Sequence, residues 1–283
     1  MRLGHCCTFV EAPIKLRHTT ARYAGSLDTR ERKRFLVELA LHNAAALADA
    51  VRWCASNGVG AFRIHNELVP LLTHPTLGWK LDPAVVRALR AVPEGVRLSF
   101  HPDQFVVPGS EREEVVASSL RELESLAAIA EHVGAEQLTL HGGGARPTKQ
   151  AALERLAAGL RRLSPRARRL IVLENDDTVY TVEDLLPLGT PLVYDVHHHR
   201  CNPDSLTVEQ ATDLAAETWR GREPWMHLSS PAERRGDRRP HADYIAPRDV
   251  PAYWRDKSLT VDIEAKAKER AVLRLKSQLA RAA

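Results

Sequence analysis

The chain has 283 residues, a formal net charge of +4 and a hydrophobic content of 44%. A globally disordered protein is excluded, because so many apolar residues can form a sizeable core. A helical membrane protein is excluded as well, because no run of about 18 apolar residues occurs. The N-terminal residues also lack the pattern of a signal peptide, so we expect a cytoplasmic protein without a membrane partner.

The charge and the cysteines give weaker information about partners and location. A positive net charge permits a polyanionic partner without requiring one. Basic residues gather at 30–34, 161–169 and 233–239, and each of these clusters can equally be a solvated surface. The four cysteines contain no C-x-x-C pair, which fits a reducing compartment and argues against a disulfide framework.

Eight short apolar segments recur along the chain and have the composition of buried strands. In chain order they span residues 2–7, 60–64, 96–100, 136–140, 169–173, 191–194, 224–228 and 259–264. Amphipathic segments with apolar residues at i, i+3, i+4 and i+7 separate them and predict helices. These helices span residues 31–58, 111–134, 149–163, 181–189, 207–219 and 265–282.

The alternation of strands with helices predicts that the strands are parallel. Eight such units in a chain of this length match a (β/α)8 TIM barrel of the α/β class, and we expect residues 1–283 to form a single domain of this kind. A doubly wound open sheet is the alternative. It is disfavoured because no Gly-rich phosphate loop follows the first strand, where the chain reads LGHCCTFVEAP.

A His, Asp or Glu residue lies at the end of each of seven consecutive predicted strands. These residues are His65, His101, His141, Glu174, Asp195, His227 and Glu264, and His74, His198 and His241 follow in the adjoining segments. In a (β/α)8 barrel these ends lie on one face, so the side chains are expected to converge on one bowl. The run His197–His199 belongs either to this bowl or to a polar loop.

Carboxylates and imidazoles crowded in one bowl would be costly without counter-charges. Divalent cations remove this cost, because they bind carboxylates and neutral imidazoles together. The number of candidate ligands suits two or three ions, and Glu174 and Asp195 are placed to bridge them. A nitrogen and oxygen set without Cys favours Mn²⁺ or Zn²⁺ over Ca²⁺. Clustered divalent ions are a common solution for phosphodiester hydrolysis, and a phosphoryl centre would also explain the basic clusters.

Seven motifs together resemble the UV damage endonuclease family. They are, in chain order, FRIHNELVPLLTHP, FHPDQF, LHGGGA, LENDD, YDVHHHRCNP, MHLSS and IEAKAKE, and they cover about residues 60 to 270. The resemblance implies a TIM barrel related to endonuclease IV enzymes, with two or three divalent ions. Mn²⁺ is the expected ion, and Zn²⁺, Mg²⁺ and Co²⁺ are alternatives. The implied reaction is hydrolytic nicking of damaged double-stranded DNA immediately 5′ to cyclobutane dimers and 6-4 photoproducts, and at other lesions such as abasic sites, without an obligatory protein partner.

The resemblance also implies roles for individual residues. The implied metal ligands are His101, His141, Glu174, Asp195, His198, His227, His241 and Glu264. The implied catalytic residues are Glu174, Asp195, His227, Glu264 and His74. Gln104 and Phe105 would enter the duplex beside the lesion, where a ring restores stacking and an amide bonds exposed base edges. Arg63, Lys266 and His5 would contact the DNA.

Three positions depart from the family pattern. Phe105 replaces a Tyr found in many members, so the ring is kept and the hydroxyl is lost. Trp225 replaces a Lys that serves as an extra ligand in some members. His5 stands where many members have a Tyr after the first strand, which leaves the lesion preference open.

Two other interpretations fit a metal-binding barrel. A sugar isomerase or epimerase would use two carboxylates with fewer histidines and would act on a small polyol. A metal-dependent DNA-binding protein would bind duplex DNA without turnover. The many histidines and the wedge-like segment 103–105 favour a nuclease, which in a prokaryote would lie with the nucleoid.

Overall fold

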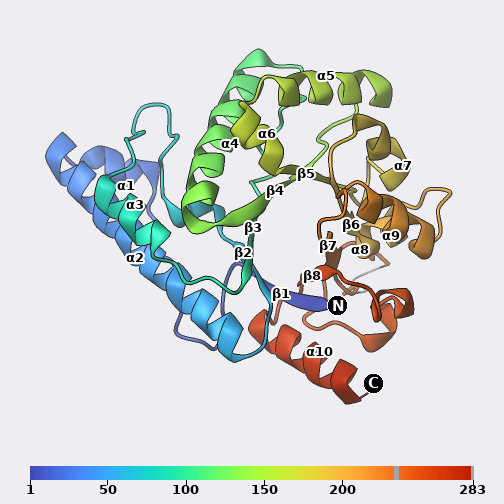
Figure 1. Ribbon diagram of the computed structural model, residues 1–283. Helices are drawn as coiled ribbons and strands as arrows, with labels where there is room; N and C mark the ends of the chain where they lie inside the picture. The colour runs from blue at the N-terminus through green and yellow to red at the C-terminus, as the bar shows by residue number, and fades with distance from the viewer. Residues whose placement is uncertain (233–235, 282–283) are drawn as a thin grey trace.

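Eight parallel strands close into a barrel (Figure 1), which confirms the predicted (β/α)8 fold. The computed structural model describes residues 1–232 and 236–281. Each strand pairs with its neighbours in sequence, and β1 closes the barrel against β8. The strands are β1 (Arg2–Cys6), β2 (Ala61–Ile64), β3 (Arg97–Phe100), β4 (Ala135–His141), β5 (Ile171–Glu174), β6 (Leu192–Asp195), β7 (Trp225–Leu228) and β8 (Thr260–Ile263).

The helices surround this barrel, and six of them correspond to the predicted amphipathic segments. They are α2 (Thr29–Ser56), α4 (Glu113–Val133), α5 (Lys149–Arg161), α7 (Val182–Leu185), α9 (Val208–Glu217) and α10 (Glu269–Arg281). The hydrophobic periodicity of the sequence did not predict the other helices, because they have too few turns for a helical repeat to be seen. These are α1 (Ala21–Ser26), α3 (Pro83–Arg90), α6 (Pro165–Leu170), α8 (Val196–Cys201) and the 3-10 turns η1 (Asn66–Leu68), η2 (Leu186–Leu188), η3 (Pro247–Asp249) and η4 (Ala252–Trp254).

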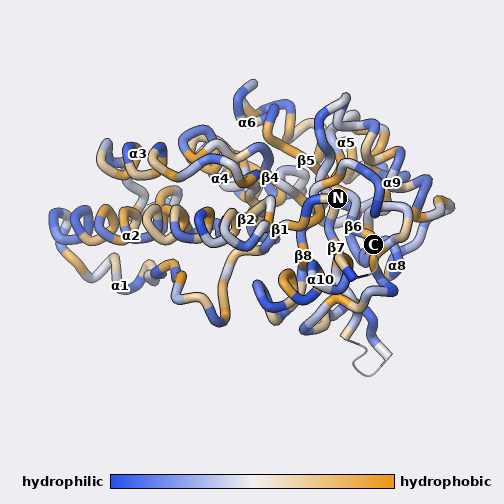
Figure 2. Tube along the Cα trace, turned by 60° about the horizontal axis from the view of Figure 1, so that its bottom comes forward, coloured by the Kyte–Doolittle hydropathy of each residue, from blue (hydrophilic) through white to orange (hydrophobic). Residues whose placement is uncertain are grey.

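The main hydrophobic core lies between the barrel and the helices. Helix α2 illustrates why, since its hydrophobic and hydrophilic residues alternate along the tube in Figure 2. The Asp28 side chain caps its first turn by accepting hydrogen bonds from two backbone N–H groups, and this satisfies donors that have no partner within the helix. Its buried face includes Leu47, Val51 and Cys54, and these residues belong to the core cluster that also contains Phe62 of β2.

Alternate residues of each strand point into the barrel, because successive side chains of a strand lie on opposite faces. A Cβ placed on Gly4 would lie 3.2 Å from Ala61 Cβ and 2.3 Å from Asp262 Oδ1. Gly4, Ala61 and Asp262 therefore share the interior. By the same alternation Cys6 faces inward, whereas His5 faces outward towards the helices.

Arg97 closes the N-terminal end of the barrel. Its guanidinium forms ion pairs with Glu136 at 2.6 Å and Glu223 at 3.2 Å, and it donates a hydrogen bond to Thr260 Oγ1 at 2.6 Å. It also stacks over the Trp225 ring, 4.1 Å from the centroid. Arg97, Trp225 and Thr260 are the first residues of their strands, so their side chains fill the N-terminal end of the barrel. An open site can therefore form only at the C-terminal end.

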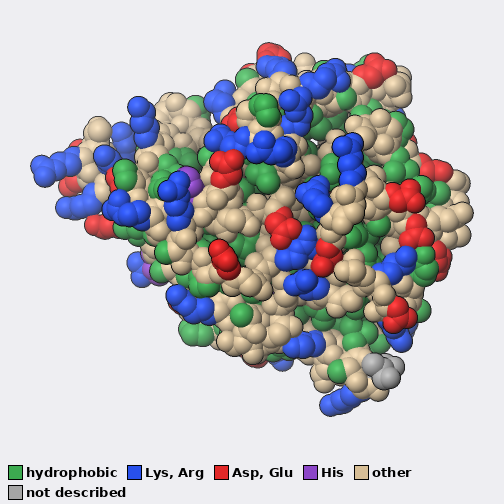
Figure 3. Space-filling view, in the orientation of Figure 1, with side chains coloured by type: hydrophobic (Ala, Val, Ile, Leu, Met, Phe, Trp, Pro, Cys, Tyr) green, Lys and Arg blue, Asp and Glu red, His purple; other side chains and the backbone are tan. Residues whose placement is uncertain are grey.

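Basic and acidic side chains are interspersed over the face shown in Figure 3. Two arginines of the basic cluster 161–169 form ion pairs, Arg162 with Glu113 and Arg166 with Glu124. In the cluster 233–239, residues 233–235 lie outside the described residues. Helices long and apolar enough to cross a membrane are absent from the part of the chain that the structure describes.

Candidate metal centre

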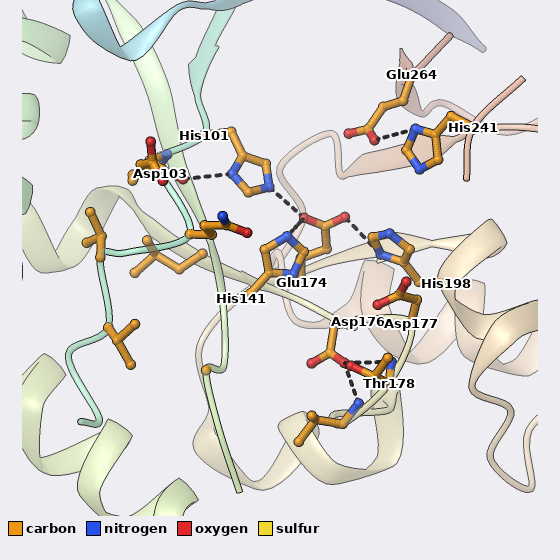
Figure 4. A pocket seen from close by; sticks show the side chains of 17 residues that line it. His101, Asp103, His141, Glu174, Asp176, Asp177, Thr178, His198, His241 and Glu264 are labelled. Carbon is orange, nitrogen blue, oxygen red and sulfur yellow. Dashed lines mark hydrogen bonds and ion pairs between the residues drawn. The ribbon is translucent and has the colours of Figure 1, made fainter. Parts of the chain in front are cut away.

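Glu174 is the centre of the histidine and carboxylate cluster. It ends β5, and only 1% of its surface is exposed. His101 Nε2 lies 2.9 Å from its Oε2, and His227 Nδ1 lies 2.8 Å from its Oε1. His141 Nε2 and His198 Nδ1 are somewhat further away, at 3.6 Å and 3.4 Å. Figure 4 shows the rings of His101, His141 and His198 pointing towards this carboxylate.

Asp195 explains the role of the triple histidine that follows it. Its Oδ1 accepts hydrogen bonds from the backbone N–H of His197 at 2.7 Å and of His198 at 2.8 Å, so Asp195 is the N-cap of α8. The histidines are thus in a helix rather than in a loop, and their rings diverge. His198 faces Glu174, whereas His197 Nε2 contacts Arg239 O at 3.1 Å and His199 pairs with Asp204 at 3.1 Å.

Glu264 follows β8 and forms the other side of the cluster. Its Oε1 lies 2.6 Å from Arg63 Nη1 and 3.3 Å from His227 Nδ1. Its Oε2 lies 3.6 Å from His241 Nδ1, and Figure 4 shows this pair on the side of the pocket opposite His101. Arg63 neutralises part of the charge that Glu264 brings to the barrel interior.

Two groups of side chains around Glu174 are close enough to hold a cation. His101, His141 and Glu174 form one group, and Glu174, Asp195, His227 and Glu264 form the other. Within each group the ligand atoms lie within 4.8 Å of one another, and Glu174 belongs to both. Asp195 Oδ2 is buried without a hydrogen-bond partner among the described residues, and such an acceptor calls for a ligand. These imidazoles and carboxylates fit a pair of divalent ions that share one carboxylate.

The pKa values show the same need for positive charge. Burial disfavours the charged form of His227, but Glu174 and Glu264 outweigh burial and raise its pKa to about 9. Burial also opposes the charge of His198, and Asp195 and Glu174 raise its pKa to about 11. Burial alone would raise the pKa of Glu174, yet His227 and His141 hold it well below its usual range. Without a metal ion, protons on histidine take the place of the cations.

A pocket of about 420 Å³ opens over the cluster, and Gln104 lines it. The next residue, Phe105, is 75% exposed. A core aromatic would be buried, so Phe105 is not a packing residue of the core. An exposed ring beside a pocket of this kind is suited to contact a ligand.

The structure contradicts the expected DNA contact of His5. Its side chain is fully buried and packs against the rings of Phe9, Trp53 and Phe62, with centroids 4.5, 6.0 and 5.7 Å away. The cause is the alternation of the strand, since a shift of one residue moves a side chain to the other face. Burial lowers the pKa of His5 to about 4, so the ring is a neutral part of the core.

The other expected DNA contacts have different outcomes. Arg63 is only 8% exposed and is paired with Glu264, so it does not present its guanidinium to a phosphate. Lys266 is exposed just beyond β8. His74 lies outside the two groups around Glu174, and its Nδ1 accepts hydrogen bonds from the backbone N–H of Thr76 and Leu77 at 3.3 Å and 3.2 Å.

His65 also lies outside these two groups, in a separate one with His18 and Glu67. Its Nδ1 accepts a hydrogen bond from Glu67 N at 3.1 Å, so the hydrogen of the neutral ring is on Nε2. This tautomer has no free lone pair on either nitrogen, which counts against a further metal site there.

Sequence reasoning missed two buried residues that hold the cluster in place. Asn175 donates a hydrogen bond from Nδ2 to Asp195 O at 2.9 Å and accepts one from Asp195 N at 2.9 Å, which joins the ends of β5 and β6. Asp262 lies in β8, and its Oδ2 is 3.8 Å from His227 Nε2. The signal for Asp262 was its spacing of two residues from Glu264, because such residues share one face of a strand.

The fold and the site define a (β/α)8-barrel protein with a histidine and carboxylate centre suited to divalent metal ions. The family model described as UV-endonuclease UvdE matches residues 1–283. The chain belongs to this family of endonucleases.

Individual members and related structures agree with this membership. The UV DNA damage endonuclease of Deinococcus radiodurans is 32% identical over 299 residues, which cover 97% of this chain and 94% of that protein. The crystal structure of SacUVDE matches with a TM-score of 0.88 at 25% identity, over 100% of this chain and 99% of that chain. Endonuclease IV from Thermus thermophilus shares the fold, with a TM-score of 0.61 at 21% identity over 83% of this chain and 94% of that chain.

Proposed function

We propose that this protein is a metal-dependent DNA repair endonuclease that nicks damaged duplex DNA immediately 5′ to UV photoproducts, and at other lesions such as abasic sites. The single observation that carries the proposal is that Glu174 belongs to two adjacent groups of metal-ligand atoms in the barrel mouth. The similarity to relatives that are named UV DNA damage endonucleases supports the substrate class. The enzyme would act in the cytoplasm, with the nucleoid, and without an obligatory protein partner.

The proposed ligands divide between the two groups. His101 and His141 would hold one ion with Glu174, and Asp195, His227 and Glu264 would hold another with the same carboxylate, with His198 and His241 completing the coordination. Two or three ions, Mn²⁺ above all and otherwise Zn²⁺, Mg²⁺ or Co²⁺, would supply Lewis-acid stabilisation of the charge on the phosphate. Because the ligands of the two groups come from the ends of six strands of a closed barrel, β3 to β8, the phosphate would meet a rigid surface.

His74 would act on the scissile phosphate rather than as a metal ligand. Since its Nδ1 accepts hydrogen bonds from its own loop, the neutral ring carries its hydrogen on Nε2. That N–H can donate to a phosphate oxygen, whereas a metal ion needs a lone pair. Lys266 would add a second, longer-range contact to the backbone of the DNA.

Gln104 and Phe105 would read the lesion. An exposed ring next to the pocket can enter the duplex and restore the stacking that a displaced base leaves. The amide of Gln104, which lines the pocket, can bond the exposed base edge. A sugar epimerase has no use for an exposed aromatic wedge, which favours the nuclease over that alternative.

The test is a nicking assay on a duplex that contains one cyclobutane dimer, with Mn²⁺ and protein whose metal content has been measured. We expect one cut immediately 5′ to the dimer and little cutting of the undamaged duplex. Folded, metal-loaded protein that cuts both duplexes equally slowly would contradict the proposal. Duplex binding without any cut would instead indicate a DNA-binding protein.

A further inference from the structure

Asp262 is a buried carboxylate with no hydrogen-bond partner for either oxygen within residues 1–232 and 236–281. It is fully buried and points into the barrel below the cluster around Glu174. A buried acceptor without a partner is costly, so each such group needs an explanation. The glycine at position 4 leaves room for this carboxylate, since a Cβ on Gly4 would lie 2.3 Å from Asp262 Oδ1.

Two buried ring nitrogens of the neighbouring strand also lack hydrogen-bond partners among the described residues. They are Nε2 of His227 and Nε1 of Trp225, both in β7. His227 is the register partner of Asp262, and its Nε2 lies 3.8 Å from Asp262 Oδ2. Trp225 precedes His227 by two residues, so both side chains face the interior, where Asp262 lies. An ionised carboxylate accepts and never donates, and it therefore complements two donors.

We infer that Asp262 is a positioning residue that accepts the Nε2 hydrogen of His227 and so turns the Nδ1 lone pair of that ring towards Glu174 and Glu264. This inference rests on the proposed metal-dependent function. His227 Nδ1 lies 2.8 Å from Glu174 Oε1 and 3.3 Å from Glu264 Oε1, so this nitrogen is the one that faces the cation site. A carboxylate on the far nitrogen fixes the tautomer and the orientation of a metal-binding imidazole.

Trp225 anchors the other oxygen of Asp262. The indole nitrogen can only donate a hydrogen bond. Asp262 can accept it, because Asp262 is not one of the proposed metal ligands. Trp225 fills the barrel interior over Arg97 and holds the residue that orients His227.

The test compares Mn²⁺ affinity in three metal-free proteins: the wild type, Asp262→Asn and Asp204→Asn. Asn places an NH2 donor where one carboxylate oxygen stands, so one of the two ring nitrogens would face a donor in place of an acceptor. We expect Asp262→Asn to bind Mn²⁺ about 10- to 100-fold more weakly in competition with a chromophoric chelator. Asp204→Asn is the matched control, because it changes the carboxylate that pairs with His199, a histidine outside the cluster. It should bind Mn²⁺ as the wild type does.

Nitrogen NMR of the wild type loaded with a diamagnetic ion such as Zn²⁺ gives a readout that needs no variant. We expect His227 to carry its hydrogen on Nε2. A hydrogen on Nδ1, or an unchanged Mn²⁺ affinity in Asp262→Asn, would overturn the inference. A wild type that binds no divalent ion would instead overturn the proposed function, and the two failures are thereby separated. If Asp262→Asn does not fold, the NMR result decides.

Discussion

His227 Nδ1 lies 2.8 Å from Glu174 Oε1, and both side chains are buried at the C-terminal mouth of the barrel. A second carboxylate, Glu264, lies 3.3 Å from the same nitrogen. The negative charge of these two carboxylates can be balanced by a proton on the His227 imidazole or by a metal cation that the imidazole and the carboxylates bind together. The choice between these two states links stability, pH and metal binding in this protein.

Glu174→Gln removes the carboxylate that both metal-ligand groups share. An amide keeps the shape but lacks the charge that holds a divalent ion, so we expect Mn²⁺ affinity and the nicking rate to fall by at least about 100-fold. Glu136→Gln makes the same chemical change beside Arg97 at the closed end of the barrel and should leave both quantities unchanged. Isothermal titration with Mn²⁺ and a gel assay measure them. Equal affinities in the two variants would show that Glu174 is not a shared ligand.

Asn175→Ala breaks the link between the ends of β5 and β6. The change removes two buried hydrogen bonds and leaves Asp195 N and Asp195 O without these partners. At about 1–3 kcal/mol for each of the two buried groups left unsatisfied, we expect a loss of about 2–6 kcal/mol in the free energy of unfolding. Urea unfolding of the metal-free protein measures it. Asn202→Ala, which removes one partly buried hydrogen bond to Asp176 O, is the control and should cost less.

The barrel and most of the cluster could be predicted from the sequence because both depend on local patterns. Apolar runs mark strands, and in a parallel barrel the residue that ends a strand must face the mouth. Glu174 and Asp195 follow from this rule alone. The expected DNA contact of His5 was wrong for a different reason. The sequence predicted the first strand but not which of its residues face the barrel interior, and a shift of one residue moves a side chain from the interior to the helix layer.

Arg63 and Asp262 show a second limit of the sequence. Both face the interior, but their partners, Glu264 and His227, lie on other strands. Which inward side chains meet across a barrel depends on strand stagger, and this is not written in the spacing of residues along one strand. The triple histidine was ambiguous for a different reason, since a six-residue helix is fixed by its Asp195 cap rather than by a period.

Phe105→Ala should separate lesion recognition from stability. The ring is 75% exposed, so we expect the free energy of unfolding to stay within about 0.5 kcal/mol of the wild type. The preference for the damaged duplex over the undamaged one should fall, whereas Phe105→Tyr should retain it because the ring is kept. Phe100→Ala is the opposite case, since Phe100 is fully buried and should cost about 3–5 kcal/mol. Nicking of paired damaged and undamaged duplexes, with urea unfolding, tests this. An unchanged preference in Phe105→Ala would exclude the wedge.

The stability of the metal-free protein should fall as the pH rises from 6.5 to 8.5. The pKa values of His227 and His198 are raised to about 9 and about 11, above the value of about 6.5 in an unfolded chain. Their contribution is therefore fully present below pH 6.5 and is lost as the pH rises towards these folded-state values. Bound cations displace the protons, so saturation with Mn²⁺ should remove the decline. Thermal melts of both forms across this range measure the decline, and His227→Asn should make it less steep in the metal-free protein, because only the His198 contribution remains. A metal-free protein that gains stability with pH would show that these histidines are neutral in the cluster.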